Sequence, residues 1–485
     1  YDLTVKPAVS LSVQREIHYR DLGQGQSTPY QFALTFTDGF GRIFQTKKKV
    51  EDGLAWKKTG STWEETASTN RWLTSGRTVY SNKQLPVKQY EPFYADGYAL
   101  ITEEELTEFG VTPVFHYDPL NRMIRTDFPD DTFSKVEFTP WEITTFDRND
   151  TLTTASPWYI AMMAGSSQQQ DAAAKALAHA DTPMIQHLDT LARPYKTIEM
   201  PDSSTDLITT IVYDIQGNTL SVTDPRSNTV FTHTYMMQGQ FIKRIHQDSG
   251  TRKVFTNVMN NPVKQWDDRG HLVITAYDAI YRVTGRRVDD GTTDRLVESY
   301  AYGEEQTSAI SKNLRGKLYR VKDGAGQTTF AEYDFKGNPK SKLQETLADY
   351  QTEINWDNPQ TLDTVTFTTT SKYDALNRPV ETVTPDNSKY VPTFNQGGDL
   401  NTVGVYLRGA AQNTSFISEI TYNSRRQRST ITYGSGVETA YAYDSKTFRL
   451  TRLNTVNGTD ILQDFEYTFD PQGNITTMND NATLI

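Results

Sequence analysis

One short pattern recurs through the chain and limits what it can fold into. The stretches "YDALNRPVETVTPDNSKY" at 373–390 and "YDPLNRMIRTDFPDD" at 117–131 share Tyr, Asp, Leu, Asn and Arg, then Thr, Pro and Asp, at identical offsets. Related copies are "YDIQGN", "YDAIYR", "YDFKGN", "YDSKTFR" and "FDPQGN", and degenerate copies are "TDGFGR", "LDTLARP" and "WDDRGH". Self-similarity of this kind indicates a repeat architecture in which each unit is one supersecondary element.

Each copy predicts a strand end followed by a tight reversal. The Asp can accept a hydrogen bond from the backbone N–H two residues later. The fourth residue after the aromatic is Gly or Asn in most copies, the types that tolerate a positive φ. "YDAIYR" and "YDSKTFR" lack this residue, so we expect longer or irregular turns there. The predicted structural turn residues are Tyr117, Asp118, Asn121, Tyr213, Asp214, Gly217, Trp266, Asp267, Gly270, Tyr333, Asp334, Gly337, Tyr373, Asp374, Asn377, Phe469, Asp470 and Gly473.

The segments between the turns alternate as half-buried strands do. In "DFEYTFD", aromatic residues at every second position alternate with polar ones. "ITYGSGVETAYAYD" predicts a hairpin with its tip at 434–436. Aromatic residues make up 12% of the chain, with 27 Tyr, which is typical of sheets with one wet face. We predict an all-β fold of antiparallel β-hairpin repeats.

Two stretches interrupt the predicted repeats with helix. An Ala-rich run from about Asp171 to Ala180 predicts a helix with Asp171 as its N-cap, ended by Thr182-Pro183. "TEEELTEFG" at 102–110 predicts a short acidic helix capped by Gly110.

These interruptions divide the chain without clean linkers. We predict a β-rich leading segment at 1–112 with weak repeat register, repeats at 113–155, a helical insertion at 156–182 and repeats at 183–485. Within the last segment, residues 391–418 are expected to form a long loop or insertion.

Composition narrows the classes of function. The formal net charge is −11 and the sequence pI about 5.3, which does not favour binding to nucleic acid. No run approaches the roughly 18 apolar residues of a membrane span. Cysteine is absent, so disulfides are excluded, and either redox compartment remains possible. The chain starts without Met or a signal-peptide profile, so we expect it to be part of something longer.

A search for catalytic chemistry gives only structural interpretations. The seven histidines show no metal-ligand spacing, and "GSG" at 434–436 is a turn rather than a nucleophile elbow. "GFGRIF" and "GAGQTT" lack the third Gly of a dinucleotide fingerprint. The carboxylates of "DFPDDTF" and "RVDDGTTD" could serve a glycosidase or autoproteolysis, but Asp130 and Asp386 occupy the same repeat offset. We predict no enzyme activity, no metal and no cofactor.

The pattern resembles the YD, or RHS, repeat over most of 113–485 and weakly over 31–50. The stretch "HADTPMIQHLDTLARPYKTIEMPD", after the Ala-rich helix, is similar to the B component of bacterial Tc (ABC) insecticidal toxin complexes. The resemblance implies a secreted virulence factor whose hairpins wind into part of a large hollow β-shell. It also implies two partners: a toxin-bearing C component, whose cytotoxic C-terminal segment the shell sequesters, and a pore-forming A component.

The chain departs from the C-component pattern near its end. There "DPQGN" at 470–474 has Asn474 where the C component's self-cleaving core has Leu. We therefore expect these residues to form an ordinary turn rather than an autoproteolytic core. Two alternatives stay open. YD repeats also occur in cell-surface adhesion or carbohydrate-binding modules, and a carboxylate glycosidase is the third interpretation.

Overall fold

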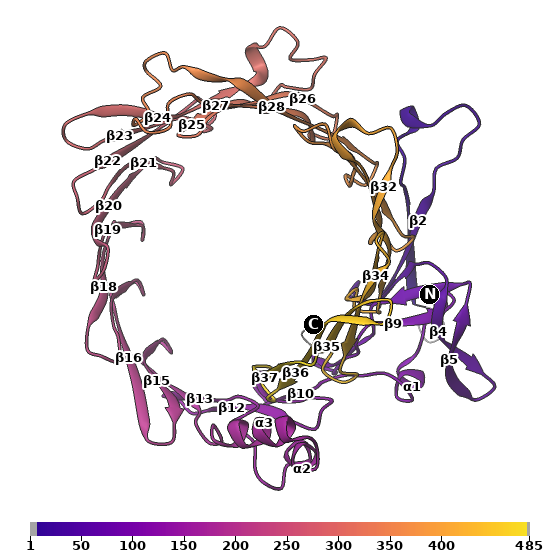
Figure 1. Cartoon of the computed structure of the whole chain (residues 1–485). Helices are drawn as coiled ribbons and strands as arrows, with labels where there is room; N and C mark the ends of the chain where they lie inside the picture. The colour runs from indigo at the N-terminus through magenta and orange to yellow at the C-terminus, as the bar shows by residue number, and fades with distance from the viewer. Residues whose placement is uncertain (1–6, 483–485) are drawn as a thin grey trace.

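The protein folds into a ring-shaped wall of hairpins with a smaller sheet on its outside (Figure 1). The computed structural model describes residues 7–482, so the ends of the predicted first and last segments, at 1–6 and 483–485, lie outside the described residues. Strands account for most elements, and they pair antiparallel throughout the wall. The predicted all-β class with a short helical insertion is therefore confirmed.

The smaller sheet, called the leading sheet below, has the strand order β1-β2-β3-β6-β9-β4-β5. Only its β4–β9 pairing is parallel. Its strands are β1 (Ala8–Arg15), β2 (Tyr30–Thr37), β3 (Ile43–Lys49), β4 (Gly53–Thr59), β5 (Thr62–Ser68), β6 (Arg71–Thr74) and β9 (Phe93–Asp96).

The wall is one continuous sheet in which each strand pairs with the next in the chain, from β10 to β37. The β7–β8 hairpin pairs with β10 and extends the same sheet beyond its first strand. The strands are β7 (Thr78–Tyr80), β8 (Pro86–Gln89), β10 (Val114–Tyr117), β11 (Met123–Asp127), β12 (Phe133–Phe138), β13 (Glu142–Phe146), β14 (Met184–Leu188), β15 (Pro194–Asp202), β16 (Thr205–Tyr213), β17 (Thr219–Thr223), β18 (Thr229–Tyr235), β19 (Phe241–His246), β20 (Gly250–Thr256), β21 (Pro262–Trp266), β22 (Leu272–Tyr277), β23 (Val283–Asp289), β24 (Asp294–Tyr302), β25 (Leu318–Asp323), β26 (Gly326–Tyr333), β27 (Pro339–Leu347), β28 (Leu362–Tyr373), β29 (Pro379–Val383), β30 (Lys389–Phe394), β31 (Leu400–Tyr406), β32 (Thr414–Tyr422), β33 (Arg428–Tyr433), β34 (Val437–Tyr443), β35 (Leu450–Asn457), β36 (Asp460–Phe469) and β37 (Ile475–Asp480).

Because consecutive strands are antiparallel, successive turns alternate between the two edges of the wall. One edge, called the YD rim, carries the turns 118–122, 189–193, 214–218, 236–240, 257–261, 278–282, 334–338, 374–378, 395–399, 423–427, 444–449 and 470–474. The other edge, called the opposite rim, carries among others the turns 128–132, 202–205, 224–228, 247–250, 267–271 and 289–293.

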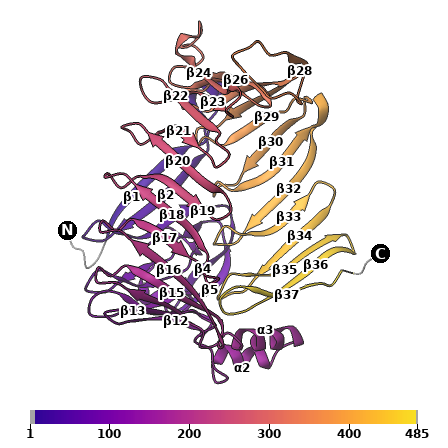
Figure 2. The same ribbon diagram turned by 90° about the vertical axis from the view of Figure 1, so that its left-hand side faces the viewer.

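The wall winds as a spiral. Seen from the side, the last strands, β29 to β37, are displaced along the ring axis from the first strands, β12 to β22 (Figure 2). The leading sheet lies at the level of the first strands. As a result, the YD rim of the last strands faces, along the ring axis, elements that come much earlier in the chain.

The two longer helices lie together on the opposite rim. α2 (Pro157–Met163) and α3 (Ser167–Leu177) form a hairpin between β13 and β14, and α3 packs on β36 and β37. The predicted N-cap at Asp171 is wrong: Ser166 caps α3 through a capping box with Gln169, so the helix begins five residues earlier.

Two further local predictions differ from the structure. Residues 391–418 form no long loop, because they lie in β30, β31, a 3₁₀ turn at Leu407–Gly409 and β32. The acidic helix is shorter than 102–110: α1 (Glu103–Leu106) begins at a Thr102 capping box and ends at Thr107. Two more 3₁₀ turns lie at Tyr19–Asp21 and Gly303–Glu305. No helix within residues 7–482 combines the length and the apolar composition required to cross a membrane.

Candidate functional site: the turn ladder and the seam of the wall

The Asp of a YD-rim turn organises the whole reversal with its carboxylate. In Asp334, Oδ1 accepts hydrogen bonds from the backbone N of Lys336 and of Asn338, both at 2.9 Å, and Oδ2 accepts one from Asn338 Nδ2 at 2.8 Å. Where Arg replaces Asn338, as at Arg193, its Nε donates to Oδ2 of Asp189 at 2.7 Å. That side-chain bond, together with the backbone bonds, lowers the pKa of Asp189.

The residue before that Asn or Arg adopts the left-handed conformation. Gly337 has φ +92° and Asn377 has φ +63°. Tyr281, in the copy without Gly or Asn, also has φ +64°, and Asp278 makes the usual two backbone bonds there. The "YDAIYR" turn is thus of normal length but strained, whereas the Asp444 turn is one residue longer, as its backbone bond to Arg449 shows.

The Tyr that precedes the Asp ties its turn to the preceding turn on the same rim. Its hydroxyl donates to the first backbone carbonyl of the strand after that turn: Tyr213 to Pro194 at 2.9 Å and Tyr277 to Pro262 at 2.8 Å. Sequence reasoning missed this role. The signal available was the repeated choice of Tyr over Phe, since only Tyr has a donor to place there.

The Arg that closes a turn points the other way, toward the next turn. Its guanidinium lies over the next aromatic of the rim, 4.8 Å from the ring centroid for Arg193 over Tyr213 and 3.9 Å for Arg282 over Tyr302. Arg193 Nη1 also donates to the backbone O of Asp214 at 3.2 Å. Asp, Arg and Tyr therefore form a ladder that fixes the spacing of neighbouring hairpins along the rim.

The structure spreads the predicted turn residues along the wall rather than gathering them in one site. Trp266, Asp267 and Gly270 lie on the opposite rim, where Asp267 Oδ1 accepts from the backbone N of Arg269 and of His271. The others lie on the YD rim: Tyr117, Asp118, Asn121, Tyr213, Asp214, Gly217, Tyr333, Asp334, Gly337, Tyr373, Asp374, Asn377, Phe469, Asp470 and Gly473. Within residues 7–482, no group of three or more His, Asp or Glu is arranged to hold a metal ion.

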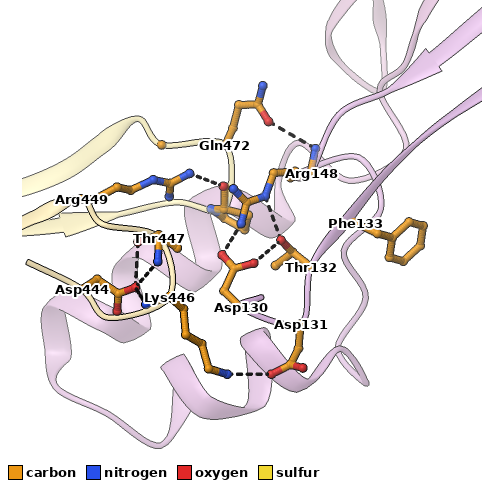
Figure 3. Close-up of polar contacts among 12 residues, drawn as sticks. Asp130, Asp131, Thr132, Phe133, Arg148, Asp444, Lys446, Thr447, Arg449 and Gln472 are labelled. Carbon is orange, nitrogen blue, oxygen red and sulfur yellow. Dashed lines mark hydrogen bonds and ion pairs between the residues drawn. The ribbon is translucent and has the colours of Figure 1, made fainter. Parts of the chain in front are cut away.

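One place does bring distant parts of the chain together, where the end of the wall meets its beginning. We call it the seam; it joins the YD-rim turns 444–449 and 470–474 to residues 128–132 and 147–150 of the opposite rim (Figure 3). Neither the Asx-turn pattern nor any local motif predicts it, because it depends on the curvature accumulated over the whole wall.

A buried ion pair stands at the centre of the seam. Arg148 pairs with Asp130, and its Nε donates to Thr132 Oγ1 at 2.8 Å (Figure 3). Both charged side chains are 10% exposed, and burial lowers the pKa of Arg148. Asp130 is therefore a structural partner at the seam.

Bonds from the last two YD-rim turns complete the seam. Asn149 Nδ2 donates to Asp470 Oδ2 at 2.9 Å, and Lys446 Nζ lies 3.3 Å from Asp131 Oδ2. Below them α3 buries three alanines, and its Lys175 donates to the backbone O of Thr476 at 3.4 Å. A polar cavity of about 520 Å³ remains between α3 and the last turn.

Further along, the leading sheet covers the same rim. Glu16 accepts a backbone hydrogen bond from Ala375 at 2.9 Å and pairs with Arg378 at 3.1 Å. The hydroxyl of Tyr94 donates to the backbone O of Asn423 at 2.8 Å. The wall is thus closed by two kinds of contact, one to its own first hairpins and one to the leading sheet.

A one-layer wall of hairpins, spaced by a rim ladder and closed at a seam, gives the chain a β-shell fold. It has the fold of the solved TcdB2-TccC3 structure, with a TM-score of 0.89 and 22% identity over 99% of this chain and 23% of that chain. The Photorhabdus luminescens Tc holotoxin pore with the TccC3 D651A mutation matches with a TM-score of 0.88 and 22% identity over 98% of this chain and 23% of that chain. No protein-family model matches the chain.

The sequence relatives agree with the fold. Toxin subunit YenC2 of Yersinia entomophaga is 24% identical over 319 residues, which cover 59% of this chain and 33% of YenC2. Toxin subunit YenC1 of the same organism is 23% identical over 337 residues, covering 63% of this chain and 34% of YenC1. The chain thus spans about a third of these relatives. The predicted resemblance to the RHS region of Tc toxin complexes is confirmed.

Proposed function

We propose that the chain is a non-enzymatic structural component of a toxin complex. It forms part of a β-shell that encapsulates the cytotoxic C-terminal segment of a partner and keeps it sequestered until translocation. The observation that carries this proposal is the wall itself: one sheet curves into a ring, and its ends are joined at the seam rather than packed into a central core (Figure 1). A chain that winds this way has an inside for a guest.

The partners follow from the same proposal. A toxin-bearing C component with RHS repeats completes the shell. A pore-forming A component is the second partner, contacted through parts outside residues 1–485. The complex is secreted, and the chain corresponds to the RHS region of its B component. The likeness to Tc structures and to the toxin subunits of Yersinia entomophaga supports a place in the RHS region of such a complex. The B-component assignment rests on the resemblance of residues 179–202.

Co-expression with an RHS-repeat partner that carries a cytotoxic segment tests the function. We expect a hollow closed particle by electron microscopy, in which the segment resists a protease that digests it when free. Small-angle scattering of the chain alone should give a radius of gyration above the roughly 23 Å of a compact globule of this length. A value of 23 Å, or a segment digested as fast in the complex as outside it, contradicts the proposal.

A seam variant makes the test specific. Arg148→Ala leaves the Asp130 carboxylate buried without its partner and removes the positive charge that attracts Asp470 across the seam, so the ring should open and the segment should lose protection. Arg226→Ala is the matched control, because its side chain is 81% exposed on the opposite rim, away from the seam. Loss of protection in the control as well would show that wall charge in general, rather than the seam, retains the guest.

A further inference from the structure

β1 is the terminal strand of the leading sheet, outside the ring (Figure 1), and among residues 7–482 only β2 pairs with it. Glu16, one residue beyond β1, donates its backbone N–H to the backbone O of Pro29 at 3.0 Å. Because hydrogen bonding alternates along an antiparallel pair, the even-numbered residues of β1 bond to β2. The backbone N–H and C=O groups of Val9, Leu11 and Val13 therefore point to the free edge.

The side chains of the same three residues continue an apolar row of the leading sheet. They lie opposite Phe36, Leu34 and Phe32 of β2. Leu34 and Phe36 are buried, whereas the three residues of β1 are 49–59% exposed. The row is covered over β2 and open over β1, so a strand added to β1 gains both backbone hydrogen bonds and apolar contact.

The edge of β1 lacks the features that keep strand edges from pairing. Proteins protect such edges with charged side chains, proline, bulges or very short strands. The other edge of the leading sheet, β5, carries the exposed Glu64 and Glu65. β1 instead runs eight residues in unbroken register with β2, and its one charged residue is the last, Arg15. β1 is therefore open to a further strand, and β5 is protected by its charges.

The sequence of β1 is complementary to itself in the antiparallel direction. Its central five residues read VSLSV, which is the same in both directions. Two copies paired about Leu11 place leucine opposite leucine, serine opposite serine and Val9 opposite Val13, with the apolar side chains on one face. Arg15 then lies opposite Pro7, so no like charges meet. A self-complementary strand of this kind fits the two-fold symmetry of most homodimers.

We propose that β1 is a homodimerisation strand, which pairs antiparallel with β1 of a second copy about a two-fold axis at Leu11. The two leading sheets then form one continuous sheet that joins the chains on the outside of their rings. One strand pair is a small interface, so the dimer is weak and its population rises with protein concentration. The pairing uses only the leading sheet and does not depend on the proposed shell function.

Cysteine cross-linking tests the register, because the chain has no cysteine of its own. Leu11→Cys places the thiols of both copies at the two-fold axis, where a short thiol cross-linker joins them. Val13→Cys is the matched control: it is similarly exposed on the same face, but its two copies lie four residues apart, about 14 Å along the strand. We expect a covalent dimer from Leu11→Cys, none from Val13→Cys alone, and one from mixed Val9→Cys and Val13→Cys chains.

Charge substitution tests the affinity. Leu11→Lys brings two ammonium groups together at the axis and should raise the dimer dissociation constant at least about 10-fold in sedimentation equilibrium. Leu54→Lys is the control, because it makes the same change at a similarly exposed position on β4 of the same sheet. It should dimerise as wild type does.

Several results would overturn the proposal. A chain that stays monomeric at every concentration has no such interface, and equal association of Leu11→Lys and Leu54→Lys places the contact elsewhere. Self-cross-linking of Val13→Cys as strong as that of Leu11→Cys contradicts the register. If Leu11→Cys cross-links only to a co-expressed RHS-repeat partner, β1 receives a strand of that partner instead. None of these results decides the shell function, which the particle and protease measurements test.

Discussion

The leading sheet and the wall reach stability by different means. The leading sheet buries an apolar cluster of Tyr90, Phe93, Ala95, Ile101 and Leu106, against which Trp56, Trp63 and Phe109 pack. A second cluster joins Leu34, Phe36 and Trp72 on the same sheet. The wall, more than three times as long, has one such cluster, around Ala309, Leu314 and Tyr333.

The difference teaches how a single layer can hold its shape. A sheet covered on one face is stabilised mainly by apolar burial. A wall exposed on both faces buries less apolar surface, so apolar burial stabilises it less. Its rigidity comes from the backbone hydrogen bonds between strands and from the hydrogen bonds of Asp, Arg and Tyr at its rim. Substitutions should therefore have their largest effects in the leading sheet for apolar groups, and at the rim for polar ones.

The largest expected effect is the loss of an apolar group from the cluster that packs on the leading sheet. Leu106→Ala removes a fully buried side chain and should lower the free energy of unfolding by about 2–5 kcal/mol. The matched wall variant Leu207→Ala, at a side chain that is 37% exposed, should cost less than about 1 kcal/mol. Urea denaturation followed by tyrosine and tryptophan fluorescence measures both, and equal costs would contradict the comparison.

The second prediction uses a charge inside the leading sheet. Lys47 is 2% exposed, its Nζ donates to the backbone O of Gly97 at 3.1 Å, and burial lowers its pKa to about 8. Lys47→Met keeps the length of the side chain and removes the buried charge, so it should stabilise the protein by about 1–3 kcal/mol at pH 7.

The pH dependence of stability provides a control for the Lys47→Met variant. Below pH 8 the amine is protonated in both states, so the cost of burying the charge is fully present. Between pH 8 and the ordinary value of 10.5, only the unfolded state keeps the proton, and stability should rise with pH. Urea denaturation at pH 7 and pH 9.5 should show this rise for wild type and not for Lys47→Met.

The third prediction concerns the rim. Asp334→Ala removes the acceptor of three hydrogen bonds, and should cost about 1–2 kcal/mol. Asp334→Asn keeps one acceptor oxygen and should recover part of this cost. Asp206→Ala is the control, an exposed wall Asp on β16 near the opposite rim. Denaturation of the three variants in parallel should rank Asp334→Ala as the least stable. Equal free energies of unfolding would show that the Asp334 carboxylate does not stabilise the turn.

A turn of the opposite rim should also weaken in acid. Hydrogen bonds from Thr384 and Ser388 lower the pKa of Asp386 to about 2. Since the unfolded state binds the proton more readily, stability from such turns is present above about pH 4 and declines as pH falls toward 2. Denaturation midpoints between pH 5 and pH 2 measure the decline, and Asp386→Asn should reduce it.

The turns could be predicted from the sequence because their contacts are local. Asp334 bonds to residues two and four positions later, and Gly337 marks the left-handed corner by its residue type. The ladder could not be predicted from the sequence, because Tyr213 and Arg193 contact partners about twenty residues away, on another hairpin. The start of α3 could have been found, because the sequence from Ser166 to Gln169 has the spacing of a capping box.

The smallest expected effect is a gain in stability at the strained turn of the wall. Tyr281 has φ +64°, where Asn377 stands in the corresponding position of another copy. Tyr281→Asn should stabilise the protein by about 0.5–1 kcal/mol, because Asn adopts the left-handed conformation more readily. The control is Asn377→Tyr, which places the bulkier residue in an unstrained copy and should destabilise by a similar amount. If thermal unfolding shows the two changes with the same sign, the turns differ by more than the residue at this corner, and the copies are not equivalent units of one wall.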